Sequence, residues 1–184
     1  MEISKFDLQL ALQKYKAYDE YEQKNLQNFS NFLQNSKEPF VRSNFIGHIT
    51  GSAYLLSNDL SQVLLHHHRF LNKWLQFGGH SDGDANTLRV AFRETIEESG
   101  IDSIVPLSLD IVDIDIHNVP PNAQKYEPAH LHYDVRFIFL TDHKDFKISQ
   151  ESNEIKWFDF TQFKSLFSKT EHYRFAKKWE LLLI

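Results

Sequence analysis

The chain contains no cysteine and no excess of basic residues, and each absence excludes a class of protein. Without cysteine there are no disulfide bonds and no thiolate ligands for a metal. The 20 Lys and Arg residues are outnumbered by 25 Asp and Glu residues, which gives a net charge of −5. Because nucleic-acid-binding proteins present basic surfaces, we expect no nucleic-acid partner.

Long hydrophobic runs are also missing. No apolar segment approaches the roughly 20 residues that a membrane-spanning helix needs. The first residues, MEISKFDLQLALQKYKAYDEYEQ, carry charges throughout and show no apolar signal-peptide core. We therefore expect a cytoplasmic protein with no membrane partner.

Aromatic residues, in contrast, are plentiful. The 184 residues include 16 Phe, 7 Tyr and 3 Trp, enough large side chains to fill the core of one domain. The sequence shows no internal repeat and no linker between two cores.

The spacing of apolar residues predicts the order of the elements. Residues 5–36 favour one or two amphipathic helices that end before Pro39, and residues 161–184 favour one or two closing helices. Alternating, β-rich segments between them predict strands at 48–56, 62–67, 111–118, 131–141 and 155–158. The long polar loop 120–128, with three prolines, is a candidate substrate gate.

The most informative segment is GHSDGDANTLRVAFRETIEESGI, residues 79–101. On a helix, Glu94, Glu97 and Glu98 stand at i, i+3 and i+4 and share one face. An apolar stripe of Leu88, Phe92 and Ile96 would bury the opposite face against a sheet, and Gly100 would end the helix. Three neighbouring carboxylates repel one another unless a cation lies between them, and oxygen ligands suit Mg²⁺ or Mn²⁺.

This segment resembles the Nudix box, whose pattern is G-x5-E-x7-R-E-U-x-E-E-x-G-U with U a bulky aliphatic residue. The matching positions are Gly79, Arg93, Glu94, Glu97, Glu98, Gly100 and Ile101. Two positions depart from the pattern. Thr95 replaces an aliphatic residue, and Ala85 stands where the first glutamate belongs. Asp82 and Asp84 are the nearby carboxylates that could replace it, and spacing alone does not decide whether they do.

The resemblance implies an α/β (α+β) fold, a Nudix-type α/β/α sandwich with a mixed β-sheet, and it covers roughly residues 45–165. Residues 41–184 would form the Nudix hydrolase domain. Residues 1–40 would be an N-terminal helical extension, packed on the core or used in a homodimer.

The resemblance also implies an activity, the metal-dependent hydrolysis of a diphosphate linkage in a small molecule of the nucleoside diphosphate-X type. The cofactor would be Mg²⁺ or Mn²⁺, held by Glu94, Glu97, Glu98 and the backbone carbonyl of Gly78. The catalytic set would be Glu94, Glu98 and Arg93, with Arg93 orienting Glu97 and bracing the loop. Outside the box, the candidate acidic ligands are Glu127, Asp134, Glu151 and Glu154, of which Glu151 or Glu154 is favoured.

Histidine is the second unusual feature, with ten in the chain. His80 follows the glycine pair, and His130 and His132 alternate along a predicted strand. A histidine-rich set can bind a transition metal or contact substrate, and we favour contact with substrate over a dedicated zinc site. The expected substrate-binding residues are His80, His132, Arg69, Trp74 and Tyr133. If charged histidines contribute, substrate binding should weaken above about pH 6.5.

Two other functions compete with hydrolysis. Isopentenyl-diphosphate isomerase shares the fold, but it needs a catalytic cysteine that this chain lacks. A catalytically impaired Nudix-like binding module would explain Ala85. Against this reading, Glu94, Glu97 and Glu98 are all present, and loss of function usually removes metal ligands first.

Overall fold

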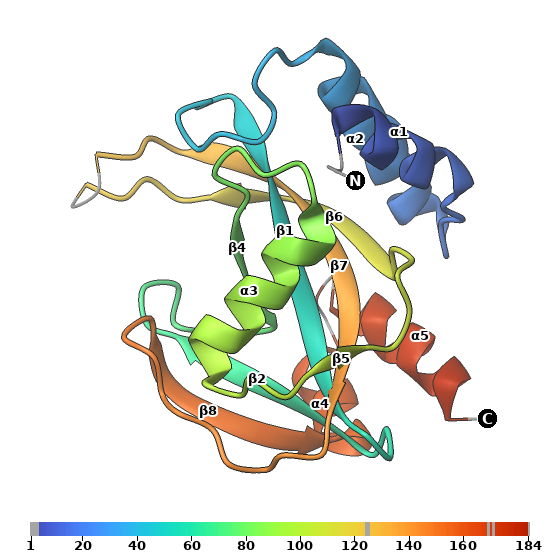
Figure 1. The fold of residues 1–184 in the computed structure, drawn as a ribbon, viewed down its shortest axis with the longest axis vertical. Coiled ribbons are helices and arrows are strands. Elements are labelled where there is room, and N and C mark those ends of the chain that lie inside the picture. The colour runs from blue at the N-terminus through green and yellow to red at the C-terminus, as the bar shows by residue number, and fades with distance from the viewer. Residues whose placement is uncertain (1–3, 124–125, 169, 171, 184) are drawn as a thin grey trace.

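The computed structural model describes residues 4–123, 126–168, 170 and 172–183, which contain five helices and eight strands. Figure 1 shows how these elements are arranged. The elements, in order, are α1 (Lys5–Lys14), α2 (Glu20–Asn35), β1 (Gly47–Ser57), β2 (Gln62–His68), β3 (Lys73–Leu75), β4 (Phe77–His80), α3 (Thr87–Ser99), β5 (Val105–Pro106), β6 (Asp113–Val119), β7 (His130–Thr141), β8 (Ser152–Asp159), α4 (Phe160–Leu166) and α5 (Tyr173–Leu182).

The strands form a single mixed sheet around β1, every residue of which is buried. Strand β1 pairs in parallel with β7 and antiparallel with β2 and β4. The hairpin partner of β7 is β6, and β8 pairs with β2. The expectation of a mixed sheet is confirmed.

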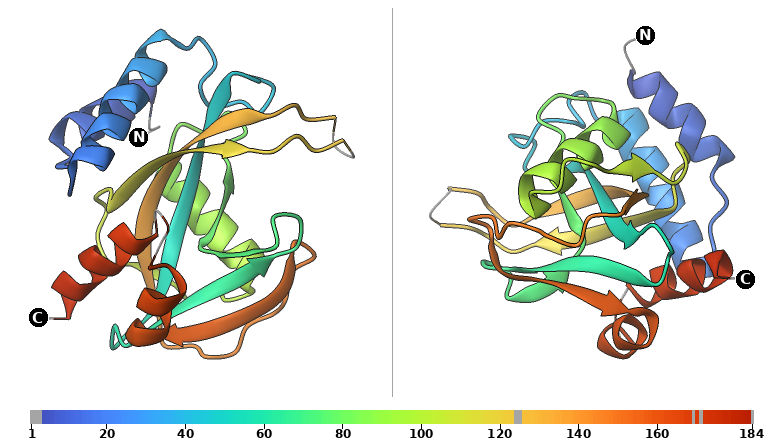
Figure 2. Two further views of the ribbon diagram at one scale, coloured as in Figure 1. Left: turned by 180° about the vertical axis from the view of Figure 1, so that it is seen from behind. Right: turned by 60° about the horizontal axis from the view of Figure 1, so that its bottom comes forward.

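Helices cover the sheet on both sides. Helix α3 crosses one face of β1, where Gly51 lies against Thr87 and Val90. Helices α4 and α5 cover part of the other face, as the rear view in Figure 2 shows, and Phe175 stacks there on Tyr54. The fold is therefore the expected α/β/α sandwich. No helix in the described part of the chain is long and apolar enough to cross a membrane.

The two N-terminal helices contribute side chains to the hydrophobic core that covers the sheet. Phe32 stacks on Tyr133 with ring centroids 3.9 Å apart, and Phe29 meets the same ring edge-on at 5.5 Å. In α1 the buried residues are Leu8 and Leu12, whereas Phe6 and Leu10 are exposed. The division of the chain at residue 40 stays a prediction.

The sheet-facing side of α3 differs from the predicted apolar stripe. Val90 and Ala91 are fully buried, while Phe92 is 36% exposed and Leu88 and Ile96 are partly buried at the rim of the core. Small residues face the sheet because the helix lies very close to β1. The acidic side is consequently not fully opposite the buried side, since Glu98 is itself only 5% exposed.

A buried ionic network, which no local sequence pattern indicates, joins the N-terminal and C-terminal helices to the sheet. Arg136 of β7 contacts Asp113, Asp115 and Asp134 at 2.8–3.2 Å, all within the sheet. From α5, Arg174 and Lys178 reach Asp113, and Lys178 also reaches Glu22 of α2 at 2.6 Å. Although burial raises the pKa of Asp113, hydrogen bonds from Arg174 and the charge of Arg136 bring it down to about 2.

Removing the central cation of this network should destabilise the fold. Arg136→Met would leave three buried carboxylates without their shared partner, at a cost of about 3–5 kcal/mol in the free energy of unfolding. Denaturant unfolding followed by circular dichroism measures the loss. Arg89→Ala removes an ion pair with Asp84 that is largely exposed on the arginine side, and we expect a loss of at most about 1 kcal/mol. Equal losses in the two variants would contradict the network's structural role.

Candidate active site

The box forms a loop and a capped helix, as its sequence predicts. Asn86 caps the start of α3, where its side chain accepts a hydrogen bond from the Arg89 backbone N–H. At the other end Gly100 adopts the left-handed conformation, with φ of 70°. This conformation favours glycine and ends the helix directly after the acidic residues.

Glu98 is the most enclosed of the three box glutamates. One carboxylate oxygen accepts a 2.8 Å hydrogen bond from the Gly78 backbone N–H, and the other lies 3.8 Å from Nδ1 of His66. Burial and, to a smaller extent, the neighbouring carboxylates Glu94 and Glu151 raise the pKa of Glu98 to about 8, although the hydrogen bond from Gly78 lowers it. A divalent cation would relieve both effects, so this oxygen-rich site fits Mg²⁺ or Mn²⁺.

Glu94 and Glu97 flank Arg93. The guanidinium lies 2.7 Å from Glu94 and 3.4 Å from Glu97, and it donates a 3.1 Å hydrogen bond to the backbone carbonyl of His80. Arg93 therefore contacts both the carboxylates and the loop, as the resemblance implies. Glu97 is exposed, whereas burial raises the pKa of Glu94.

The glycine pair of β4 makes room for Glu94. A Cβ atom on Gly79 would lie 2.5–2.7 Å from the carboxylate atoms of Glu94. Any larger residue at this position would push the carboxylate out of its place. The backbone of β4 and the acidic side of α3 therefore share one site.

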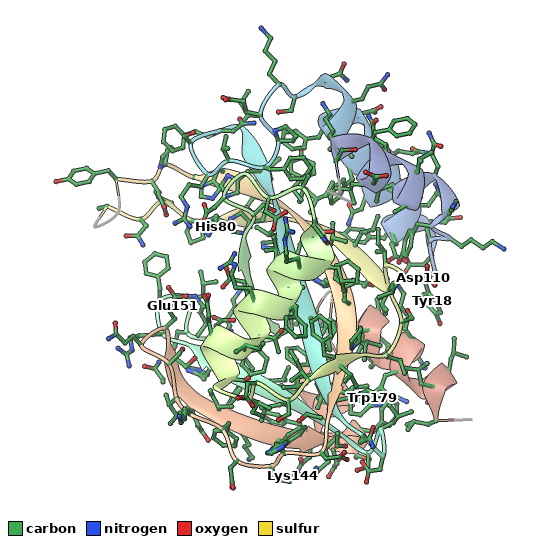
Figure 3. The ribbon with its side chains drawn as sticks, viewed as in Figure 1. Tyr18, His80, Asp110, Lys144, Glu151 and Trp179 are labelled. Atoms are coloured by element: carbon green, nitrogen blue, oxygen red, sulfur yellow. The ribbon has the colours of Figure 1, made fainter. Side chains whose placement is uncertain are left out.

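A second loop brings a fourth carboxylate close to the box. Glu151 lies in the turn before β8 and contributes electrostatically to the raised pKa values of both Glu94 and Glu98. Figure 3 shows Glu151 on the same side of α3 as His80. The backbone N–H of Arg69 donates to the Glu151 carbonyl, and its guanidinium donates to the carbonyl of Ser152. Arg69 thus braces this loop.

The other acidic candidates outside the box lie elsewhere. Asp134 is buried on the opposite face of the sheet from α3, where it accepts hydrogen bonds from Thr50 and Ser52. Glu154 is exposed on β8, in register with His67 of β2. Glu127 pairs with Asn122 in an isolated bridge within the predicted gate loop, of which residues 124–125 lie outside the described residues.

The departure at Ala85 is not matched by a free carboxylate nearby. Asp82 forms a bidentate ion pair with Arg42, and Asp84 forms one with Arg89. Each arginine lowers the pKa of its partner. Both aspartates are therefore engaged by arginines, and compensation for Ala85 stays untested.

Two expected substrate-binding residues lie within packed surroundings. Tyr133 is 7% exposed and its ring lies against Phe29 and Phe32, on the sheet face opposite to that of its neighbour His132. Trp74 packs edge-on against Phe158 and His67. Both rings pack against other aromatic side chains, so each has a packing role in the structure.

His80 and His132 do come together, and His48 and His130, which the sequence pattern does not place in the site, lie beside them. His48, His80, His130 and His132 each place a ring nitrogen within 4.8 Å of the other three. Burial lowers the pKa of His80 to about 3 and also lowers the pKa values of His48 and His132. These shifts favour the neutral imidazole, so the three residues do not support the charge change on which the expected pH dependence of substrate binding rests.

A large hollow lies apart from these residues. A volume of about 1210 Å³ opens between α1, α5 and the segment before β6, lined among others by Tyr15, Tyr18 and Leu182. It contains none of the predicted site residues. The candidate site is therefore identified by its clustered carboxylates and not by the size of a cavity.

The raised pKa of Glu98 predicts how stability changes with pH. An unfolded glutamate ionises near pH 4.5 and folded Glu98 near 8, so folding favours the protonated form. This contribution is fully present below about pH 4.5 and is lost as pH rises through 8. In metal-free protein the free energy of unfolding should fall between about pH 6.5 and 8, by at most about 1.4 kcal/mol per pH unit.

Denaturant unfolding at several pH values checks this, with Glu98→Gln as the matched variant. Measurements above pH 6.5 avoid the effect of the buried histidines, whose protonation lowers the free energy of unfolding only at more acidic pH. The variant should show a flatter profile than wild type, and excess Mg²⁺ should flatten the wild-type profile. Parallel profiles without metal would contradict the burial of an ionising Glu98.

No protein-family model matches the sequence, and no curated protein matches it either. Solved structures do match its fold. The Ap4A hydrolase of C. elegans aligns with a TM-score of 0.55 at 16% identity, over 73% of this chain and 96% of that one. The dihydroneopterin triphosphate pyrophosphohydrolase of E. coli gives the same score and identity, over 73% and 94%.

Two further structures extend the likeness. A MutT protein from Methanosarcina mazei Go1 aligns with a TM-score of 0.54 at 20% identity, over 75% of this chain and 94% of that chain. The Nudix domain of Shewanella oneidensis NrtR, solved with ADP ribose, aligns at 0.52 and 16%, over 84% and 98%. At these identities the likeness concerns the fold. Together with the box at α3, it shows that this chain has the Nudix fold.

Proposed function

We propose that the protein is a Mg²⁺- or Mn²⁺-dependent hydrolase that cleaves a diphosphate linkage in a small nucleoside diphosphate derivative. The observation that carries the proposal is the gathering of Glu94, Glu97, Glu98 and Glu151 beside the backbone of Gly78. These groups come from a helix, a strand and a distant loop. The energetic cost of their mutual repulsion and partial burial is offset when a divalent cation is bound.

In this proposal Glu97, Glu98, Glu151 and the Gly78 carbonyl hold the metal. The bound ion would neutralise phosphate oxygens and lower the pKa of water. Glu151 is preferred over Glu154 because it acts electrostatically on two box glutamates, whereas Glu154 lies on β8 beside His67.

Glu94 is proposed as the general base. Its carboxylate is held against Gly79 by the 2.7 Å ion pair with Arg93, so it has one preferred position. Its raised pKa makes it a better proton acceptor than an exposed glutamate. Arg93 is a positioning residue, because it contacts Glu94, Glu97 and the His80 carbonyl.

The substrate class rests on the fold and on charge. Several proteins of this fold are named for the hydrolysis of small phosphoanhydrides, among them Ap4A hydrolase and dihydroneopterin triphosphate pyrophosphohydrolase. The Nudix domain of NrtR was solved with ADP ribose. The net charge of −5 is unfavourable for tracking along RNA or DNA. His80 follows the glycine pair directly, but its ring joins three other histidines and not the box carboxylates, so we assign it no contact with substrate.

The alternative is a Nudix-like module that binds a nucleotide or metabolite without cleaving it. Ala85 favours this alternative, and the intact carboxylate cluster favours hydrolysis. A phosphate-release screen with Mg²⁺ or Mn²⁺ over nucleoside di- and triphosphates, dinucleoside polyphosphates, ADP-ribose and NADH separates the two. Ligand binding with no product for any substrate would support the binding module.

Loss of a metal-holding carboxylate should abolish most of the activity. For the best substrate of the screen, Glu97→Gln and Glu98→Gln should each lower kcat at least about 100-fold, which corresponds to about 2.7 kcal/mol. Excess EDTA should do the same to wild type. Steady-state assays over a range of Mg²⁺ concentrations measure both effects. Wild-type turnover in Glu98→Gln or in EDTA would contradict the assignment.

The loop ligand can be tested with a matched pair. Glu151→Gln should raise the Mg²⁺ concentration needed for half-maximal activity and lower kcat. Glu154→Gln changes the same residue type three positions away and should behave as wild type. The reverse pattern would transfer the ligand role to Glu154.

A further inference from the structure

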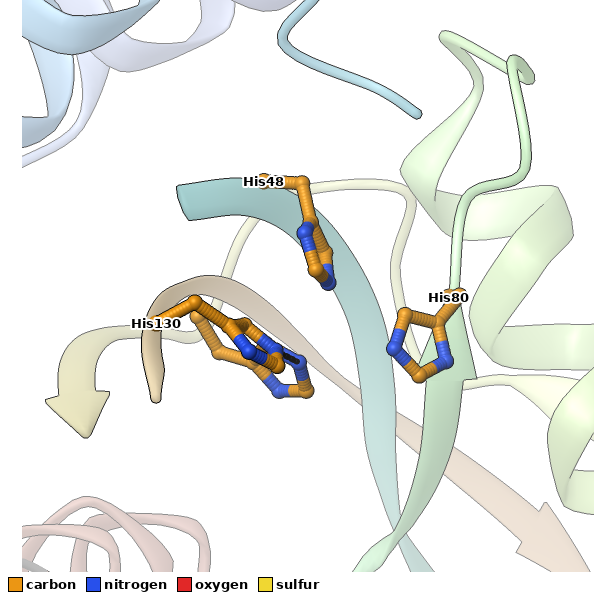
Figure 4. A group of neighbouring side chains, drawn as sticks. His48, His80 and His130 are labelled. Atoms are coloured by element: carbon orange, nitrogen blue, oxygen red, sulfur yellow. Dashed lines mark hydrogen bonds between the residues drawn. The ribbon is translucent and has the colours of Figure 1, made fainter. Parts of the chain in front are cut away.

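Four histidines converge on the sheet face that lies opposite α3. His48 comes from the start of β1, His80 from the end of β4, and His130 and His132 from the start of β7. A ring nitrogen of each lies within 4.8 Å of a ring nitrogen of every other. Figure 4 shows the rings of His48, His80 and His130 directed toward one another from three different strands. Parallel pairing of β1 with β7 places His48 beside His132.

Backbone carbonyls fix the orientation of two of these rings. Nδ1 of His130 lies 2.8 Å from the Pro128 carbonyl, and Nδ1 of His48 lies 3.4 Å from the Asn44 carbonyl. A carbonyl oxygen can only accept, so each Nδ1 carries the proton. Each Nε2 then presents a lone pair to the centre of the cluster. Metal-binding histidines are commonly oriented by a carbonyl in this way.

The centre of the cluster has an unsatisfied acceptor. Nε2 of His48 is buried and has no hydrogen-bond partner among the described residues, and the His48 residue is only 1% exposed. A buried polar atom without a partner is costly unless a ligand fills the gap. Nearby, Nε2 of His130 and Nε2 of His132 lie 3.2 Å apart. Two nitrogens that bind zinc tetrahedrally at about 2.0–2.1 Å are separated by about 3.3 Å.

We propose that His48, His80, His130 and His132 form a second metal site, which binds one divalent transition-metal ion of the zinc class. Four imidazole nitrogens with no carboxylate suit Zn²⁺ and disfavour Mg²⁺, which prefers oxygen ligands. An anion would need N–H donors at the centre, whereas His48 and His130 present acceptors there. This site is chemically distinct from the carboxylate site on α3.

The position of the site implies a structural effect on the proposed active site. Strand β4 pairs with β1 and carries Gly78 and Gly79 directly before His80. A metal bound by His80 and by residues of β1 and β7 would fix the end of β4 to the middle of the sheet. Zinc should therefore stabilise the fold and raise its melting temperature.

Metal titration of tag-free, metal-free protein tests the proposal. The double variant Glu97→Gln/Glu98→Gln removes the carboxylate site, so any remaining high-affinity binding belongs elsewhere. In this variant we expect one equivalent of Zn²⁺ to bind at sub-micromolar concentration, undisturbed by excess Mg²⁺. Co²⁺ should give the intense visible absorption of a four-coordinate ion. Zn²⁺ should also raise the melting temperature.

Histidine variants in the same background identify the ligands. His48→Gln and His80→Gln should each weaken Zn²⁺ binding at least about 100-fold and abolish the rise in melting temperature. His143→Gln alters an exposed histidine outside the cluster and should bind as the parent does. Circular dichroism without metal confirms folding, and His80 is the less buried of the two tested positions. Absence of stoichiometric Zn²⁺ in the parent, or unchanged affinity in both cluster variants, would overturn the proposal.

Discussion

The close approach of α3 to the sheet is the constraint on which the candidate active site depends. At Gly51 there is no room for a side chain between β1 and the first turns of the helix, where Thr87 and Val90 lie. At Gly79 the space that a Cβ would occupy is filled by the carboxylate of Glu94. With glycine at both positions, the helix lies low enough for Glu98 to accept a hydrogen bond from the β4 backbone.

This geometry explains the electrostatics of the site. Glutamates on a distant helix would be solvated and would ionise normally, but here two of the three are partly or wholly buried. Burial raises the pKa values of Glu94 and Glu98, and Glu151 adds to the effect from another loop. Concentrated, desolvated negative charge creates a strong preference for a divalent cation. On the other face of the sheet, the histidine cluster and the Arg136 network bury further polar groups.

Local features of the site were predictable from the sequence because they depend on residues close together in the chain. The spacing of Glu94, Glu97 and Glu98, the helix end at Gly100 and the contact from Arg93 to Glu97 all follow from helical geometry. The spacing of apolar residues gave the order of strands and helices, and the resemblance to the Nudix box supplied the mixed sheet between helices. The stripe through Phe92 failed because the helix buries small residues at a close contact.

Features that depend on long-range pairing were not predictable. His48 joins the other histidines only because β1 pairs in parallel with β7, which nothing near residue 48 indicates. Alternation along β7 similarly sends His132 to one face and Tyr133 to the other, against Phe29 of α2. Arg136 meets Asp113 and Asp115 through the β6–β7 register. In each case the partner lies far away in the sequence.

The most direct test of the central claim is the turnover of Gly79→Ala, with its Mn²⁺ affinity measured alongside by electron paramagnetic resonance. The added methyl group displaces the end of the Glu94 side chain and leaves the backbone in place, so the fold should survive. Gly83→Ala is the control, because a Cβ there meets nothing within 4 Å, although its φ of 92° adds some strain. We predict that Gly79→Ala lowers turnover about 100-fold, or about 2.7 kcal/mol, because the general base Glu94 is displaced. Mn²⁺ affinity should stay close to that of wild type, because the carboxylates proposed to hold the metal are left in place. Wild-type turnover in a folded Gly79→Ala protein would contradict the account.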